Sequence, residues 1–296
     1  MSALDPATKT WADRIRPNLK RATWALDMYQ TLVPAPSRLD DLPETRATLA
    51  QWILRHGDSW YRNQPDMSNA AEMADAIDFD ALARVTAVAP PYWIVQEMCA
   101  LVDVANRSYE PSQDVQPLAP TGFAYFQAPL TFEDNDGSWS LAGFVWSRDV
   151  AHPIQEAEGK LFPATPVVSH GPHMGGPNKG MLNAVGIIQT LWLLASQRLT
   201  VTTTRRPDRA ARRRCARLKV EDGDVQVIDL RRLAHAPGGG TGSEVDWSHR
   251  WMVDGHWRNH YYPSEDKHRQ IWIAPHVKGP PDKPLVVQER VYRWKR

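Results

Sequence analysis

The sequence contains very little cysteine. Cys99 and Cys215 are the only two among 296 residues, and they lie far apart in the chain. Neither belongs to a C-x-x-C pair, the spacing that zinc sites and redox motifs commonly use. We therefore predict no cysteine-based metal or redox centre and expect both to be packing or incidental residues.

Long apolar runs are also missing. The longest, MLNAVGIIQTLWLLA (181–195), is short and is interrupted by Asn183 and Gln189, whereas a membrane-spanning helix needs about 20 apolar residues. The first residues lack the basic, apolar and small-residue order of a secretion signal. We therefore expect no membrane span and a cytoplasmic location.

A large net charge is absent as well, although the charge is unevenly distributed. The formal net charge is +1, but residues 1–200 carry −7, with 15 basic and 22 acidic residues, and residues 201–296 carry +8, with 20 and 12. An anionic partner such as nucleic acid would dock on this basic C-terminal third.

Helical periodicity dominates the first third of the chain. Apolar residues recur at helical spacing in four segments separated by Pro and Asp clusters. These segments are 9–33, 43–63, 70–86 and 92–109. We predict a helical region over residues 1–115 and find no catalytic spacing in it.

Residues 118–149 are rich in aromatic and β-favouring residues. Residues 134–137 carry an Asp-Gly turn signal typical of a hairpin. A buried helix is predicted at 181–199, a strand at 224–232, and an ordered loop or lid at 162–181. The fold class is therefore α+β, with an N-terminal helical layer followed by a mostly antiparallel sheet with a basic face. Residues 116–296 form its second region, or continue a single domain.

The segment 255–280 holds four histidines and two tryptophans among several basic residues. We read residues 244–278 as a hairpin, in which alternate residues of the strand 244–262 point to opposite faces. Its polar face, if it coincides with that of the return strand 269–278, gathers Arg250, Asp254, His256, Arg258, His260, His276 and Lys278. A bulge at Gly255 would reverse the second half of this assignment.

Three interpretations of this polar surface compete. In the first, Arg250, His256, Arg258 and Lys278 bind RNA phosphates while aromatic rings stack on unpaired bases. In the second, two of the candidates His256, His260 and His276 act as general base and acid of a metal-independent ribonuclease. In the third, the histidines are structural. Binding is favoured because no nucleophile, metal spacing or paired carboxylate is visible.

A second basic feature is the predicted helix 205–219, which has eight basic residues and one acidic residue. Arg209 and Arg213 are candidate RNA contacts, although a solvated surface helix is an equally good interpretation. Pro207 suits its first turn. His170 and His173 could share a metal only with further ligands, so we predict no metal and no cofactor.

Two sequence motifs near the C-terminus resemble motifs of known proteins. HRWMVDGHWRN (249–259) and IWIAPHVKGP (271–280) resemble the C-terminal signature of proteins from actinobacteria, their plasmids and their phages. That group also carries segments like LAPTGFAYFQAPL (118–130) and RPDRAARRRCARL (206–218). The Gly-His-Trp box 255–257 and the aromatic strand after it are distantly similar to the type V-A anti-CRISPR family, which blocks production of the Cas effector.

Members of that anti-CRISPR family are understood to recognise a nascent N-terminal peptide and to cause loss of its mRNA during translation. The resemblance implies a regulator associated with a mobile element or phage, which binds RNA or the translating ribosome and a target polypeptide and silences one gene product. A host nuclease is a further implied partner. The N-terminal helices show no match, so the target is expected to differ. The alternatives are a ribonuclease toxin or defence enzyme and a protein-binding module with structural histidines.

Overall fold

The computed structural model describes residues 27–63, 70–112, 115–134, 137–147, 150–164, 167–168, 179–231, 249–280 and 282–286. Most of the first predicted helix, the histidines at 170 and 173, and residues 244–248 of the predicted hairpin lie outside these ranges. None of the helices in the described part of the chain combines the length and apolarity that crossing a membrane requires.

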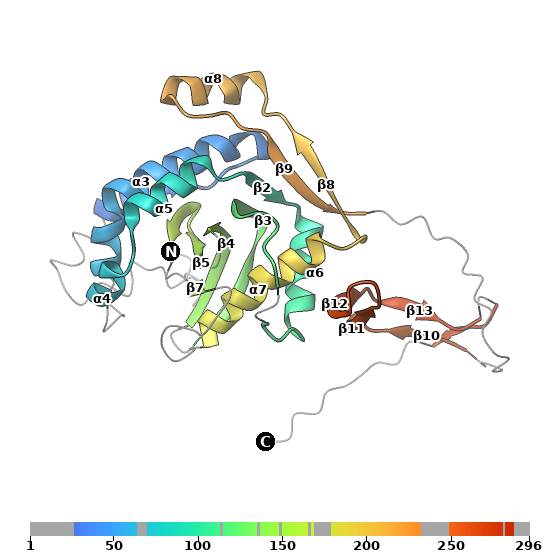
Figure 1. The fold of residues 1–296 in the computed structure, drawn as a ribbon. Helices are drawn as coiled ribbons and strands as arrows, with labels where there is room; N and C mark the ends of the chain where they lie inside the picture. Colours follow the sequence, from blue (N-terminus) through green and yellow to red (C-terminus); the bar gives the residue numbers. More distant parts are fainter. Residues whose placement is uncertain are drawn as a thin grey trace, which may run out of the picture.

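A nine-stranded sheet forms the centre of the fold (Figure 1). Its strands are β1 (Val33–Pro34), β2 (Pro91–Ile94), β3 (Thr121–Asp134), β4 (Gly137–Ser147), β5 (Val150–Ala157), β6 (Lys160–Pro163), β7 (Val167–Val168), β8 (Thr200–Arg205) and β9 (Val225–Leu230). They follow the order β1-β6-β5-β4-β3-β2-β9-β8, and β7 pairs with β5. Strand β2 runs parallel to both neighbours, whereas the other pairs are antiparallel.

Helices cover both faces of this sheet (Figure 1). On one face α3 (Leu42–Arg62) and α5 (Phe79–Val88) pack against Phe123 and Tyr125, and on the other α6 (Gln96–Asn106) and α7 (Lys179–Ala195) pack against Ala124 and Phe126. This alternation along β3 follows from the period of two in a strand. The structure confirms an α+β fold with an N-terminal helical region and a mostly antiparallel sheet.

Several predicted elements are confirmed. The helix predicted at 43–63 is α3, the buried helix is α7, and the strand predicted at 224–232 is β9. The Asp-Gly turn signal marks the hairpin of β3 and β4, in which Asp134 pairs with Gly137. Residues on both sides of position 115 contribute to each of the two core clusters.

Two helix predictions are wrong in part. Residues 92–94, predicted as the start of a helix, belong to β2, which lies between β3 and β9. A central strand covered on both faces reads as an uninterrupted apolar run, and periodicity does not separate it from a helix. The helix predicted at 70–86 is divided into α4 (Ala70–Asp75) and α5, because the Asp78 side chain caps α5 by accepting a 2.8 Å hydrogen bond from the Ala81 N–H.

The C-terminal strands form a separate projection beside α6, which we call the arm (residues 249–280; Figure 1). It contains β10 (Arg250–Val253), β11 (His256–Tyr262), β12 (Lys267–Ile273) and β13 (His276–Lys278). Strands β11 and β12 pair with each other, and β10 pairs with β13 and with β14 (Leu285–Val286). The predicted hairpin is therefore present but is interrupted in both strands.

Candidate functional site

One register runs through the whole arm. Val253 pairs with His276, and His256 pairs with Ile273. The two residues between β10 and β11 (254–255) therefore lie across from the two residues between β12 and β13 (274–275). The break at Gly255 therefore does not shift the register. A Cβ at this glycine would lie 2.4 Å from the Trp272 ring, which explains why glycine occupies the break.

The register divides the predicted polar residues between the two faces. On β11, His256, Arg258 and His260 share a face, because alternate residues of a strand point the same way. Their cross-strand partners on β12 share that face; these are Ile273, Ile271 and Arg269. On β13, His276 and Lys278 pair with Val253 and Trp251 of β10 and share their face. Arg250 points to the other face of β10. The polar sides of the two strands do not coincide, so the seven residues do not form one surface.

The candidate catalytic histidines do not meet. His256 and His260 are four residues apart on one strand, which corresponds to about 13 Å, whereas an acid and a base must both reach the same reacting group. His276 projects from a different strand, in the part of the arm beyond the break. The Nδ1 atoms of His256 and His276 lie 3.1 Å from the carbonyl oxygens of Asp254 and Ala274, respectively. These imidazoles are therefore held by their own local backbone.

Two tryptophans attach the arm to the main body. The Trp257 Nε1–H donates a 2.9 Å hydrogen bond to the Ala105 carbonyl at the end of α6, and its ring centroid lies 5.2 Å from that of Tyr109. Trp272 pairs with Trp257 at 5.3 Å and is 3% exposed. The Trp272 amide donates to the Gln197 side-chain oxygen at 3.1 Å. This face of β11 and β12 is used for docking.

The opposite face of β11 points to solvent. His256 and Arg258 are exposed, and so are His276 and Lys278 on β13. Arg250 is half-buried, and its Nε–H donates a 2.7 Å hydrogen bond to the Lys283 carbonyl. Four of these five candidate residues are therefore accessible to a ligand, whereas Arg250 is partly engaged within the protein.

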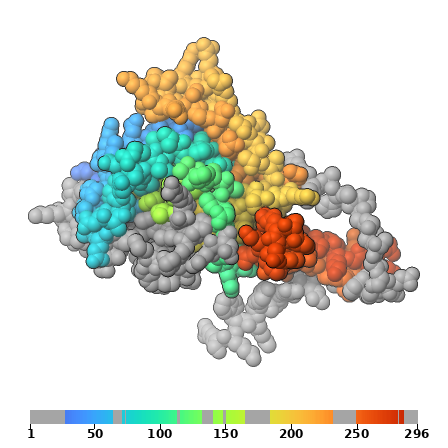
Figure 2. All heavy atoms as spheres, in the orientation of Figure 1, coloured from blue at the N-terminus to red at the C-terminus, as the bar shows by residue number. Residues whose placement is uncertain are grey.

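The predicted basic helix begins later than expected. It is α8 (Arg209–Leu218), capped by the Asp208 carboxylate, which accepts a 2.7 Å hydrogen bond from the Ala211 N–H. Pro207 precedes the cap rather than occupying the first turn, since Asp208 is the better N-cap residue. Arg209 and Arg213 are exposed, as the prediction requires. Figure 2 shows α8 at the top of the molecule and the arm at its right side, so the two basic features are separate.

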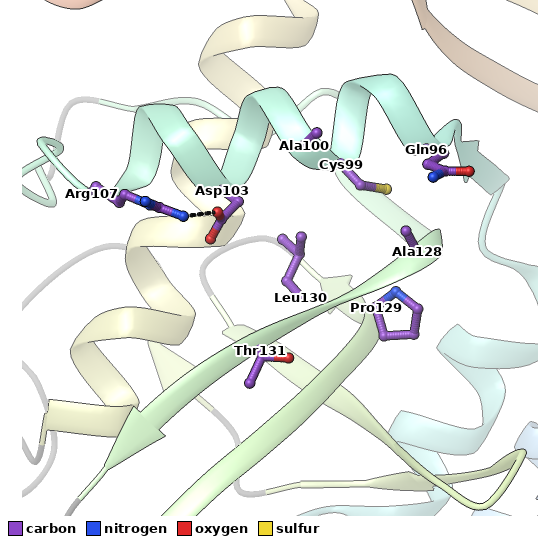
Figure 3. Close-up of a pocket in the computed structure, with 9 residues that line it drawn as sticks. All are labelled: Gln96, Cys99, Ala100, Asp103, Arg107, Ala128, Pro129, Leu130 and Thr131. Carbon is purple, nitrogen blue, oxygen red and sulfur yellow. Dashed lines mark hydrogen bonds and ion pairs between the residues drawn. The ribbon is translucent and has the colours of Figure 1, made fainter. Parts of the chain in front are cut away.

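A groove between α6 and β3 is a feature that the sequence did not reveal. It has a volume of about 410 Å³, and Figure 3 shows Gln96, Asp103 and Arg107 on the helix side and Thr131 on the strand side. Arg107 and Asp103 form a 2.6 Å ion pair at one end. The groove opens where β2 ends and β3 changes register between Tyr125 and Leu130. Its lining is a mixture of polar and apolar side chains, and it is open to solvent, so it does not resemble an enclosed apolar ligand pocket.

The groove contains no activated nucleophile. Cys99 lines it, but its side chain is almost fully buried, and burial raises the pKa of the thiol to about 11. The reactive form of cysteine is the thiolate, so Cys99 stays protonated and inert near neutral pH. Among the described residues, no group of three His, Cys, Asp or Glu side chains is placed to bind a metal ion.

Comparisons with known proteins give a weak structural likeness. No protein-family model matches the sequence, and no curated protein matches it. Among solved structures, the chain is similar to AcrVA2, with 13% sequence identity and a TM-score of 0.33, over 89% of this chain and 97% of that one. AcrVA2 is an anti-CRISPR protein, but a likeness of this size transfers no function, and no comparison points to the actinobacterial group.

Proposed function

We propose that this protein is a cytoplasmic regulator that binds RNA, free or within a translating ribosome, and lowers the amount of one specific gene product. The observation that carries the proposal is the division of the arm into two faces. Trp257 fastens one face of β11 to α6, while His256 and Arg258 on the other face are exposed. Within the described residues, Arg258 has no ion pair, so its charge is available to a phosphate.

Phosphate binding suits this geometry better than catalysis. A guanidinium offers a planar set of donors that matches phosphate oxygens, and Arg258 projects from a strand whose position is fixed by the docked tryptophans. At the arm tip, Arg269 lies over the Tyr262 ring at 5.4 Å, and His260 packs edge-on to the same ring. Such rings can stack on unpaired bases. Lys278 and His276 would add contacts from the other face.

Silencing of a specific product requires recognition of a target as well as RNA affinity. We assign a target polypeptide, such as a nascent chain, to the groove between α6 and β3. In the described part of the chain, β3 has no strand partner on that side beyond Phe126, and an extended polypeptide can pair with such an edge. Loss of the mRNA, with a host nuclease as the cutting enzyme, would complete the mechanism.

RNA binding by purified variants tests the proposal. Arg258→Ala should weaken binding of a single-stranded RNA by about tenfold and reduce its salt dependence by about one unit, because one phosphate contact is lost. His256→Ala should cause a smaller loss. Arg84→Ala is the matched control, since Arg84 is also exposed but lies on α5, away from the arm.

The same variants, expressed in cells, connect binding to silencing. Transcript levels measured by RNA sequencing should show one transcript falling with the wild-type protein and recovering with Arg258→Ala. If neither substitution changes RNA binding or any transcript level, the proposal is wrong. If the purified protein cleaves RNA alone, and His256→Ala abolishes cleavage while binding persists, the protein is instead a ribonuclease.

A further inference from the structure

Three arginines of α8 form a stripe on its solvent face. Arg209, Arg213 and Arg217 are spaced four residues apart and are all exposed. At 100° per residue they fall on the side opposite Ala211 and Cys215, the buried residues through which α8 packs against the body. Successive arginines are therefore displaced by about 6 Å along one line.

The charge of this arginine stripe is not neutralised locally. Within the described residues, no carboxylate pairs with Arg209, Arg213 or Arg217. The nearest acidic side chain in sequence, Asp208, caps the helix and is paired with Arg38 at 3.2 Å. A row of three unpaired guanidinium groups is the arrangement that binds a polyanion and releases its counterions.

The helix that carries the stripe is firmly held. On the flank of α8, Arg214 forms ion pairs of 2.6 Å with Asp41 and 2.5 Å with Glu44, and these carboxylates raise its pKa. Arg46, 2% exposed, donates to the carbonyls of Ala89 at 2.6 Å and of Glu221, just after α8, at 3.4 Å. The stripe is thus presented on a fixed backbone, and binding need not order it.

The segment of the chain that carries the stripe lacks aromatic residues. Residues 193–231, which include β8, α8 and β9, contain no Phe, Tyr or Trp. The strand that leads into α8 exposes threonines instead. Proteins that hold single-stranded nucleic acid stack its bases on aromatic rings, so this surface is poorly equipped for a single strand. In a double helix the bases are already stacked, and phosphates and hydroxyl groups are what remain to be bound.

We propose that the arginine stripe of α8 binds the sugar–phosphate backbone of double-helical RNA without reading its sequence. This rests on the proposed RNA-binding function but concerns a surface separate from the arm, as Figure 2 shows. The arm meets unpaired RNA, and the stripe meets a folded, base-paired part of the same or another RNA molecule.

A salt titration with RNA duplexes tests the proposal. The probes are two unrelated RNA duplexes of about 20 base pairs and a single strand of equal length. Each phosphate contact contributes about 0.9 to the slope of log affinity against log salt. Arg209→Gln/Arg213→Gln should therefore lower the slope by about 1.8. When the salt concentration rises fourfold, the affinity of this variant should then fall about twelvefold less than that of the wild-type protein. Adding Arg217→Gln should lower it by a further 0.9 or so.

The control is Arg55→Gln/Arg84→Gln, which removes the same charge from exposed positions on α3 and α5. It should leave the slope within about 0.3 of the wild-type value. Both duplexes should bind equally, and the loss in the stripe variant should be larger for duplex than for single strand. Thermal unfolding of every variant establishes that the fold is retained.

Two outcomes would overturn the inference: an unchanged slope in the stripe variant, or a loss seen with the single strand but not with the duplex. If Arg258→Ala still weakens RNA binding in those cases, the proposed function stands without the stripe. If instead the stripe variant loses duplex binding while Arg258→Ala affects neither binding nor transcripts, the stripe binds duplex RNA and the proposed function fails.

Discussion

The attachment of the arm through Trp257 leads to a prediction about local stability. Trp257→Ala removes the ring contacts with Tyr109 and Trp272 and the hydrogen bond to the Ala105 carbonyl. Truncation of a fully buried tryptophan costs about 3–5 kcal/mol, and a hydrogen bond contributes about 1 kcal/mol. Because Trp257 is only partly buried, we expect a total loss of about 2–3 kcal/mol.

This loss should fall on the arm, because the described contacts between the arm and the body centre on Trp257 and Trp272. A change of 2–3 kcal/mol corresponds to an open population that increases by about 30- to 150-fold. Hydrogen exchange measured by mass spectrometry should show faster exchange in β11 and β12, while β3 and β4 exchange as before.

Two variants calibrate the measurement. Trp257→Phe keeps an aromatic ring but loses the N–H donor, so it should lose about 1 kcal/mol. Tyr261→Ala, at the 43% exposed tip position, removes the hydrogen bond to Asp266 and the ring contact with His268. Both partners lie within the tip, so the docking should stay intact. If exchange in β3 rises as much as in β11, the arm does not open independently and the reasoning is refuted.

Two further predictions concern the body of the protein. Burial lowers the pKa of His152 to about 4 from 6.5, so the folded state keeps it neutral while the unfolded chain gains a proton as the pH falls. Stability should fall between pH 6.5 and 4, with about 2 kcal/mol lost at pH 5, and His152→Gln should remove that part of the pH dependence in urea unfolding. Gly143→Ala would place a methyl group 2.0 Å from the Ala124 carbonyl oxygen and should destabilise the fold by about 3 kcal/mol or more in thermal unfolding. The control Gly223→Ala, with no neighbouring atom within 4 Å, should change stability by less than about 0.5 kcal/mol.

Much of the fold follows from local sequence signals. The period of α3, the apolar surface of α7 and the turn between β3 and β4 each lie within one short segment, and each is where the sequence predicts it. Strand β2 is different, because its pairing partners β3 and β9 are distant in the chain. Whether a short apolar run becomes a strand or a helix is then decided by tertiary contacts.

The candidate site also depends on contacts that local sequence signals do not show. The period of two correctly predicts that His256, Arg258 and His260 share a face, but it does not fix how the return strand is matched. That match depends on the turn at residues 263–266 between Tyr262 and Lys267. One residue more or fewer in this turn would move His276 and Lys278 to the face of Arg250. The groove beside α6 was not predictable either, since it arises where β2 ends beside a register shift in β3.

The described residues of the basic C-terminal third therefore do not form one basic surface. Within the described residues, the basic side chains of α8 and those of the arm lie at separate places on the molecule (Figures 1 and 2). On α8, Arg214 is already paired with Asp41 and Glu44. If the protein binds RNA as proposed, a short oligonucleotide should engage one of the two surfaces, whereas a folded RNA with paired and unpaired parts should engage both at once. Two modest contacts on one molecule then combine through effective concentration. The proposed function therefore predicts that a large, structured RNA binds more tightly than a short strand.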